Sequence, residues 1–195
     1  MAEQLPASLQ AALADFAKWL EEAQIPATII GGIAASILGR PRLTRDIDAL
    51  AILPEEEWAK AAQSAARYGI VPRIDDVLGF ARRSRVLLMK HVASGIDLDL
   101  TFGGLPFERS AVEQSIPCDV DGVLIRLPRV EHLLIMKAVA GRPKDLEDIR
   151  GLLDAHSEVD VAEARRWIRE FANATGMPRM LEEFDKLLER RPRGS

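Results

Sequence analysis

The chain has 195 residues, enough for one or two small domains with a hydrophobic core. Hydrophobic residues make up 48% of it and charged residues 29%, and the formal net charge of -4 argues against binding nucleic acid through overall positive charge. No apolar run approaches the length of a membrane span, and the amino terminus lacks the pattern of a signal sequence, so we expect a cytoplasmic protein without membrane contacts. The single cysteine, Cys118, excludes an internal disulfide and, with three histidines, disfavours structural zinc.

The first predicted elements lead to a pair of glycines. Apolar residues recur at helical spacing over residues 7–23, which predicts an amphipathic helix. Residues 27–30 are apolar and partly β-branched, as in a buried strand, and Gly31 and Gly32 then permit a turn into a helix over residues 33–38. Free backbone N–H groups at such a helix start can hold a phosphate, although a tight turn needs glycine just as often.

The next predicted strand carries two aspartates. Side chains alternate between the faces of a strand, so Asp46 and Asp48 share a face while Ile47 and Ala49 pack inward. Two neighbouring carboxylates repel each other unless a cation lies between them, and Mg²⁺ prefers carboxylate oxygens. The pair therefore predicts half of a phosphoryl-transfer site, although an isolated pair of this spacing more often marks a solvated strand end.

The glycine pair, the Thr44-Arg45 step and the aspartate strand together resemble the nucleotidyltransferase superfamily that includes DNA polymerase beta. The resemblance implies a third carboxylate from a later strand and a bound divalent metal, Mg²⁺ or Mn²⁺. It also implies roles for matching residues: nucleotide phosphates on Gly31, Gly32 and Arg45, and metal on Asp46 and Asp48. The chain departs from the family in having Gly-Gly where many members have Gly-Ser, and Ser36, one helical turn further on, is not a simple replacement.

The middle of the chain supplies candidates for the third carboxylate. Residues 54–68 predict a helix, and residues 70–85 leave open a short helix or a loop over the site. Residues 86–92 and 96–102 predict a β-hairpin whose second arm carries Asp97 and Asp99 on one face. The segment from Asp99 through Pro-Phe-Glu resembles small bacterial members of the superfamily. That likeness makes Asp99 the expected third carboxylate and proton acceptor, with Asp97 as the alternative. Either can equally be an acid on the polar face of a half-exposed strand.

One more helix and one more hairpin are predicted before the pattern becomes helical at residue 128. Residues 107–114 predict a short helix, and residues 116–127 predict a second hairpin that turns at Asp121-Gly122. We expect an α+β fold in which a small mixed β-sheet forms a nucleotidyltransferase core over residues 1–127. Residues 128–195 are expected to form a helical region packed on that core.

The helical region carries a second charged motif. Lys137 lies in an apolar helix, Gly141-Arg142-Pro143 breaks the chain, and Lys144, Asp145 and Asp148 follow in a new helix. This order resembles the AbiEii-type nucleotidyltransferases, several of which are toxins of toxin–antitoxin pairs. The resemblance implies that Lys137 and Lys144 contact nucleotide phosphates, with Asp145 and Asp148 in support. On spacing alone Lys137 is structural, and Lys144 with Asp148 is an ordinary i,i+4 pair.

These patterns predict a metal-dependent enzyme that transfers NMP from an NTP to an acceptor hydroxyl. Arginine clusters at residues 40–45, 82–85 and 190–193 would suit a tRNA end, whereas the acidic balance would suit a small hydroxylated molecule, and a protein side chain stays open. The rival hypothesis is a non-catalytic module of the same fold that binds a nucleotide or a protein partner such as an antitoxin.

Overall fold

The computed structural model describes residues 5–189, and the chain within it divides into two compact units. The first unit runs to Ile33 and resumes over Leu43–Pro128, and the second comprises Ala34–Arg42 and the chain from Arg129 onward. The segment 34–42, ahead of the first aspartate strand, therefore groups with the carboxyl-terminal helices.

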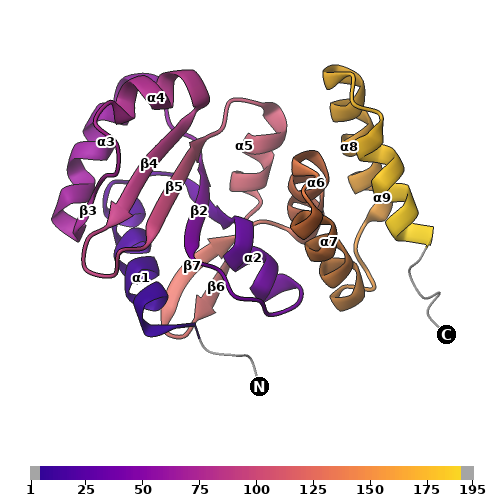
Figure 1. The fold of residues 1–195 in the computed structure, drawn as a ribbon, viewed down its shortest axis with the longest axis horizontal. Helices are drawn as coiled ribbons and strands as arrows, with labels where there is room; N and C mark the ends of the chain where they lie inside the picture. The colour runs from indigo at the N-terminus through magenta and orange to yellow at the C-terminus, as the bar shows by residue number, and fades with distance from the viewer. Residues whose placement is uncertain (1–4, 190–195) are drawn as a thin grey trace. The chain divides into compact units, whose positions relative to one another are not determined.

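The first unit is built on a mixed sheet of five strands in the order β1-β2-β5-β4-β3 (Figure 1). The strands are β1 (Ala27–Ile30), β2 (Asp46–Ala51), β3 (Ile70–Pro72), β4 (Val86–His91) and β5 (Asp97–Phe102). Strands β2 and β5 are parallel, and the other neighbours are antiparallel. The predicted hairpin of β4 and β5 is present. Residues 70–85, for which the sequence allows a helix or a loop, begin with the edge strand β3 and continue into a short helix at Val77–Ser84.

Helices and a second hairpin complete this unit. The helices are α1 (Ala7–Glu22), α3 (Trp58–Ala65), α4 (Val77–Ser84) and α5 (Pro106–Glu113), with short 3-10 helices η1 (Glu55–Glu57) and η2 (Ala66–Tyr68). Helix α2 (Gly31–Leu38) begins in this unit, and its residues from Ala34 onward belong to the second. Strands β6 (Ile116–Val120) and β7 (Val123–Leu127) pair as predicted. Asp121 and Gly122, at their turn, both have positive φ angles. Glu108 stabilises the start of α5, because its carboxylate accepts the backbone N–H groups of Gly104 and Leu105.

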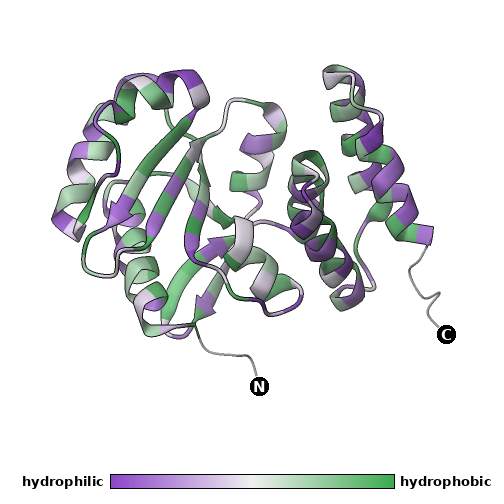
Figure 2. Cartoon of the chain, in the orientation of Figure 1, coloured by the Kyte–Doolittle hydropathy of each residue, from purple (hydrophilic) through white to green (hydrophobic). Residues whose placement is uncertain are grey.

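Alternation along β2 and β5 gives the sheet one apolar and one polar face, as the colours of these strands show in Figure 2. Ile47, Leu98 and Leu100 are fully buried. Helix α3 covers the apolar face, where the ring of Trp58 stacks on Phe102 with centroids 4.2 Å apart. Because the apolar side chains of β2 and β5 point to this buried face, the aspartates that alternate with them lie together on the opposite face of the sheet.

The second unit is helical. Its elements beyond the end of α2 are α6 (Val130–Ala140), α7 (Pro143–Ala155), α8 (Val161–Thr175) and α9 (Arg179–Glu189). Gly141 ends α6 in the left-handed conformation, with φ +61°. Arg165 joins α8 to α9 through an ion pair with Asp185 at 2.7 Å. The predicted arginine cluster at residues 190–193 lies outside the described residues. None of the helices within residues 5–189 has the length and apolar character needed to cross a membrane.

Candidate functional site

The register between β2 and β5 brings carboxylates of both strands together. Asp46 lies opposite Asp97, and Asp48 lies opposite Asp99, in the parallel ladder. Side chains at paired positions point to the same face, so the structure gathers all of the predicted metal-binding aspartates on one patch of the sheet. We call these residues, Asp46, Asp48, Asp97 and Asp99, the aspartate cluster.

Gly31 allows the Asp48 carboxylate to lie against the start of α2. Strand β1 pairs Ile30 with Asp48, and Gly31 follows with φ +65°. A Cβ atom at position 31 would lie 2.6 Å from the Asp48 Cγ, so any side chain there would overlap the carboxylate. The first N–H groups of a helix have no partner within it, and this approach places Asp48 beside them. Glycine is thus required at position 31 both by the positive φ angle and by the neighbouring Asp48 carboxylate.

An arginine already lies in the aspartate cluster. Arg73 follows edge strand β3, and its side chain extends past β4 to reach β5. One guanidinium nitrogen lies 3.2 Å from Asp97 Oδ2 and another lies 2.9 Å from Asp99 Oδ1. Lys90 of β4 is 3.4 Å from Asp97 Oδ1. Arg73 and Lys90 thus neutralise the carboxylates of β5. At the start of β2, the hydroxyl of Thr44 donates a hydrogen bond to the Asp46 carboxylate at 3.0 Å.

The cluster alters the acidity of Asp99. Burial raises the pKa of its carboxyl above the ordinary value of 3.8. The positive charge of Arg73 opposes this shift, while the negative charges of Asp46 and Asp97 add to it. Because a carboxylate with a raised pKa is a stronger base, this shift suits Asp99 to accept a proton.

The donor set fits a divalent cation, although the side chains do not form a ready cage. Within residues 5–189, no three His, Cys, Asp or Glu side chains converge closely enough to hold a metal ion. The donors of the aspartate cluster are nonetheless all carboxylate oxygens, which Mg²⁺ prefers. Asp97 Oδ1 and Asp99 Oδ1 are also buried without a hydrogen-bond partner, because Lys90 and Arg73 meet them at ion-pair distance but not in hydrogen-bond geometry. The residues that could hold a metal are therefore those of the aspartate cluster, which include the predicted ligands Asp46, Asp48 and Asp99.

The charged motif of the second unit forms a buried ion-pair network. Lys137 is 4% exposed, Asp145 is fully buried and Asp148 is 7% exposed. The Lys137 ammonium lies 2.8 Å from Asp148 Oδ2 and 3.3 Å from Asp145 Oδ1. Arg42 also binds Asp148 through two nitrogens, at 2.8 and 3.1 Å, and Arg142 binds Asp145 at 2.6 Å. The predicted i,i+4 partner Lys144 takes no part in this network.

The predicted phosphate ligands differ in whether their side chains already have partners in the protein. The Lys137 ammonium would have to leave or share carboxylates in order to meet a phosphate. Lys144 and Arg45 are exposed, and no hydrogen bond or ion pair of either side chain is found within residues 5–189. Among the other arginines of the predicted clusters, Arg40 binds Asp154 at 2.6 Å and Arg82 lies 3.4 Å from Glu55. These pairs reduce the basic surface that a tRNA would need.

The acid stability of the second unit is expected to depend on Asp145. Burial alone would raise its pKa, but hydrogen bonds and positive charge from Arg142 and Lys137 outweigh burial and hold the pKa below the ordinary 3.8. A lowered pKa adds stability that is complete above the unfolded value and is lost as the pH falls through the folded one. Melting temperatures should therefore fall more steeply in the wild type than in Asp145→Asn between about pH 5 and pH 2. Parallel profiles would contradict this role.

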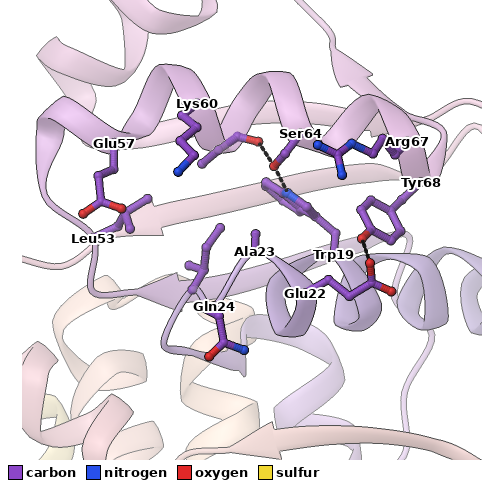
Figure 3. A pocket seen from close by; sticks show the side chains of 12 residues that line it. Trp19, Glu22, Ala23, Gln24, Leu53, Glu57, Lys60, Ser64, Arg67 and Tyr68 are labelled. Carbon is purple, nitrogen blue, oxygen red and sulfur yellow. Dashed lines mark hydrogen bonds between the residues drawn. The ribbon is translucent and has the colours of Figure 1, made fainter.

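The first unit also contains a cavity whose lining is less suited to catalysis than the aspartate cluster. It measures about 480 Å³ and lies between the end of α1 and the face of α3 and η2 (Figure 3). Its most prominent polar groups already have partners: the Trp19 indole donates to Ser64, and the Tyr68 hydroxyl donates to Glu22. None of its lining residues belongs to the aspartate cluster. The cluster is therefore the stronger candidate site.

Sequence reasoning misses two arginines of these clusters. Arg73 lies in the segment that the sequence leaves open between a loop and a helix, and no pattern around it signals a partner on β5. Arg42 stands out only as one of three nearby arginines, and its pairing with Asp148 joins positions 106 residues apart. Contacts of such sequence separation follow from tertiary packing and leave no local signal.

Comparison with solved structures supports the predicted fold. The antibiotic-resistance factor ANT(2'')-Ia, solved in solution, matches with a TM-score of 0.60 and 14% identity over 88% of this chain and 95% of that chain. An antigenic nucleotidyltransferase-like protein from Paracoccidioides brasiliensis matches with a TM-score of 0.56 and 14% identity over 93% and 95% of the two chains. The lincosamide antibiotic adenylyltransferase LnuA, solved with lincomycin, matches with a TM-score of 0.54 and 17% identity over 78% and 99%.

At these identities the likeness establishes the fold alone, and it confirms the predicted α+β architecture. A search of curated protein sequences found no match. A family model described as nucleotidyl transferase of unknown function (DUF2204) matches residues 9–183, nearly the whole chain. The chain is therefore a member of this nucleotidyltransferase family.

Proposed function

We propose that the protein is a metal-dependent nucleotidyltransferase that transfers NMP from an NTP to an acceptor hydroxyl. The observation that carries this proposal is the parallel register of β2 and β5, which sets Asp48 beside Asp99 on one face of the sheet. Several carboxylates side by side are unfavourable unless cations lie between them, and a divalent metal would add to the positive charge that Arg73 and Lys90 supply. Membership of the nucleotidyltransferase family gives that arrangement a chemical purpose.

The residues would divide the work as follows. Asp46, Asp48 and Asp99 would hold Mg²⁺ or Mn²⁺, which when bound neutralises phosphate charge. The acceptor oxygen would attack the α-phosphorus while the bond to the β-phosphate oxygen breaks, so pyrophosphate leaves. Asp99 would receive the proton of the acceptor hydroxyl, consistent with its burial and raised pKa. The protein contributes mainly positioning and charge neutralisation in such a reaction.

The proposed phosphate ligands are Gly31, Gly32, Arg45, Lys137 and Lys144. Backbone N–H groups at the start of α2 suit an anion, and Arg45 is exposed next to Asp46 in the chain. Lys137 differs from the others because two carboxylates already hold its ammonium. We therefore expect Lys137→Gln to weaken NTP binding only if phosphate replaces one of those carboxylates.

Titration calorimetry tests the proposal. We expect the protein to bind one or more NTPs in the presence of Mg²⁺. Asp46→Asn with Asp48→Asn should weaken that binding about 100-fold or more, because loss of the proposed ligands themselves should cost at least as much as loss of the groups that support metal ligands. The matched control is Glu56→Gln with Asp75→Asn, which removes two negative charges from exposed positions of the same unit. It should bind NTPs as the wild type does.

Absence of NTP binding with either Mg²⁺ or Mn²⁺ would contradict the catalytic proposal. It would favour the non-catalytic module, and a search for a protein partner would follow. Binding that survives in the double variant would instead show that the nucleotide lies away from the aspartate cluster.

The acceptor separates two versions of the proposal. LnuA is a lincosamide antibiotic adenylyltransferase, which makes a small hydroxylated molecule one class to test. The other version, a toxin that modifies a tRNA end and is inhibited by an antitoxin, requires a basic surface, and several of the predicted arginines are already paired. We therefore favour the small molecule. Transfer of α-labelled NTP, assayed against tRNA and against hydroxylated antibiotics, distinguishes the two.

A further inference from the structure

We propose that Arg73 is a built-in counter-ion that competes with the divalent metal for Asp99 and so sets the metal affinity of the site. This inference rests on the proposed function, because it concerns the same aspartate cluster. It adds a residue that sequence reasoning does not select.

The position of Arg73 is the first observation. The guanidinium is within 2.9 Å of Asp99 Oδ1, the carboxylate that a metal at Asp46 and Asp48 would need as its third ligand. Arginine is always charged, and it can contact two carboxylates at once through its planar fork. The same Asp99 oxygen cannot be a full ligand of both cations, so the two compete.

The second observation is the geometry of the contact between Arg73 and Asp99. Asp99 Oδ1 is buried and has no hydrogen-bond partner although Arg73 lies at ion-pair distance. A charge-assisted hydrogen bond would be stronger than this contact. Arg73 therefore holds Asp99 mainly through charge, and a metal ligated directly by the oxygen can displace Arg73 from it.

Asp97 provides the place to which Arg73 can withdraw. A different guanidinium nitrogen lies 3.2 Å from Asp97 Oδ2, so Arg73 can keep that partner when it releases Asp99. Asp97 also has Lys90 at 3.4 Å. This arrangement explains why β5 carries two aspartates on one face: Asp99 is the ligand, and Asp97 retains the arginine.

Manganese binding, measured by the electron paramagnetic resonance signal of free Mn²⁺, tests the inference without an activity assay. We expect Arg73→Gln to bind Mn²⁺ at least about fivefold more tightly than the wild type, the lower end of typical coupling between two ligands. Arg73→Lys retains the positive charge and should stay close to the wild type. Arg82→Gln is the matched control, because it removes an arginine from an exposed ion pair of the same unit, and it should leave the affinity unchanged.

Thermal melting in the presence of a chelator gives a second measurement. Arg73→Gln should melt at a lower temperature than the wild type because the carboxylates then repel one another, and added Mn²⁺ should raise its melting temperature more than it raises that of the wild type.

Each outcome has a distinct meaning. Equal or weaker Mn²⁺ binding by Arg73→Gln, while the wild type binds and Asp46→Asn with Asp48→Asn does not, would overturn the role of Arg73 and leave the proposed function standing. Absence of Mn²⁺ binding in both the wild type and Arg73→Gln would overturn both.

Discussion

Asp148→Asn is expected to lower the free energy of unfolding of the second unit by about 3 kcal/mol, because it removes the buried negative charge that two cations share and leaves their charge in excess. Asp148 is the residue that Lys137 and Arg42 share, with both cations at 2.8 Å. Without it, Lys137 retains only Asp145 at 3.3 Å, and Arg142 holds that carboxylate as well.

The same geometry predicts a smaller effect for the lysine. Lys137→Met leaves each carboxylate with an arginine, Asp148 with Arg42 and Asp145 with Arg142, so no buried charge loses every partner. An apolar side chain of similar length can then replace the ammonium stem at low cost. We therefore expect Lys137→Met to destabilise the unit by less than Asp148→Asn does.

Urea denaturation followed by far-UV circular dichroism measures these changes, and hydrogen exchange of α6 and α7 assigns them to the second unit. The matched control is Asp154→Asn, the same substitution on the same helix in the exposed pair with Arg40. It should cost less than about 1 kcal/mol. If Asp148→Asn costs no more than Asp154→Asn, the buried network does not stabilise this unit.

The sequence is sufficient for most of the fold because local patterns determine most of its elements. Strict alternation in β5 and the Asp121-Gly122 turn predict the two hairpins, and both are present. The glycine pair and the two aspartate pairs each lie within one short segment. The sequence therefore identifies them as candidate site residues without knowledge of the tertiary structure. The parallel pairing of β2 with β5, which joins those segments, is not encoded in any local pattern, and the resemblance to the superfamily implies only that a third carboxylate comes from a later strand.

Charge pairing between distant segments cannot be predicted in the same way. Arg73 reaches β5 from beyond an intervening strand, and nothing in its neighbouring residues distinguishes it from the exposed Arg82 or Arg83. Lys137 is a different case: spacing suggests a structural lysine and resemblance suggests a phosphate ligand, and the structure shows its ammonium between two aspartates. Its role toward a nucleotide stays a prediction, because buried partners do not exclude an exchange with phosphate.

Gly31→Ala is expected to damage both the first unit and its aspartate cluster. A left-handed backbone costs a residue with a Cβ about 1–2 kcal/mol, and overlap with a packed neighbour adds about 1–3 kcal/mol. Here that neighbour is the Asp48 carboxylate, whose Cγ lies 2.6 Å from the point that the alanine Cβ would occupy. Relief of the overlap would displace the Asp48 carboxylate from its position in the aspartate cluster, so Mn²⁺ affinity should fall together with stability.

Gly95→Ala separates these two contributions. Gly95 has φ +71°, close to the +65° of Gly31, but a Cβ there would meet no atom within 4 Å. It should therefore show the backbone cost of about 1–2 kcal/mol alone and bind Mn²⁺ as the wild type does. An equal loss of stability and metal affinity in both variants would mean that the contact between Gly31 and Asp48 has no special part in the site. A larger loss in Gly31→Ala, together with weaker Mn²⁺ binding, would show that the first glycine of the pair is needed to position a metal-binding carboxylate, a role separate from any contact that its N–H group makes with phosphate.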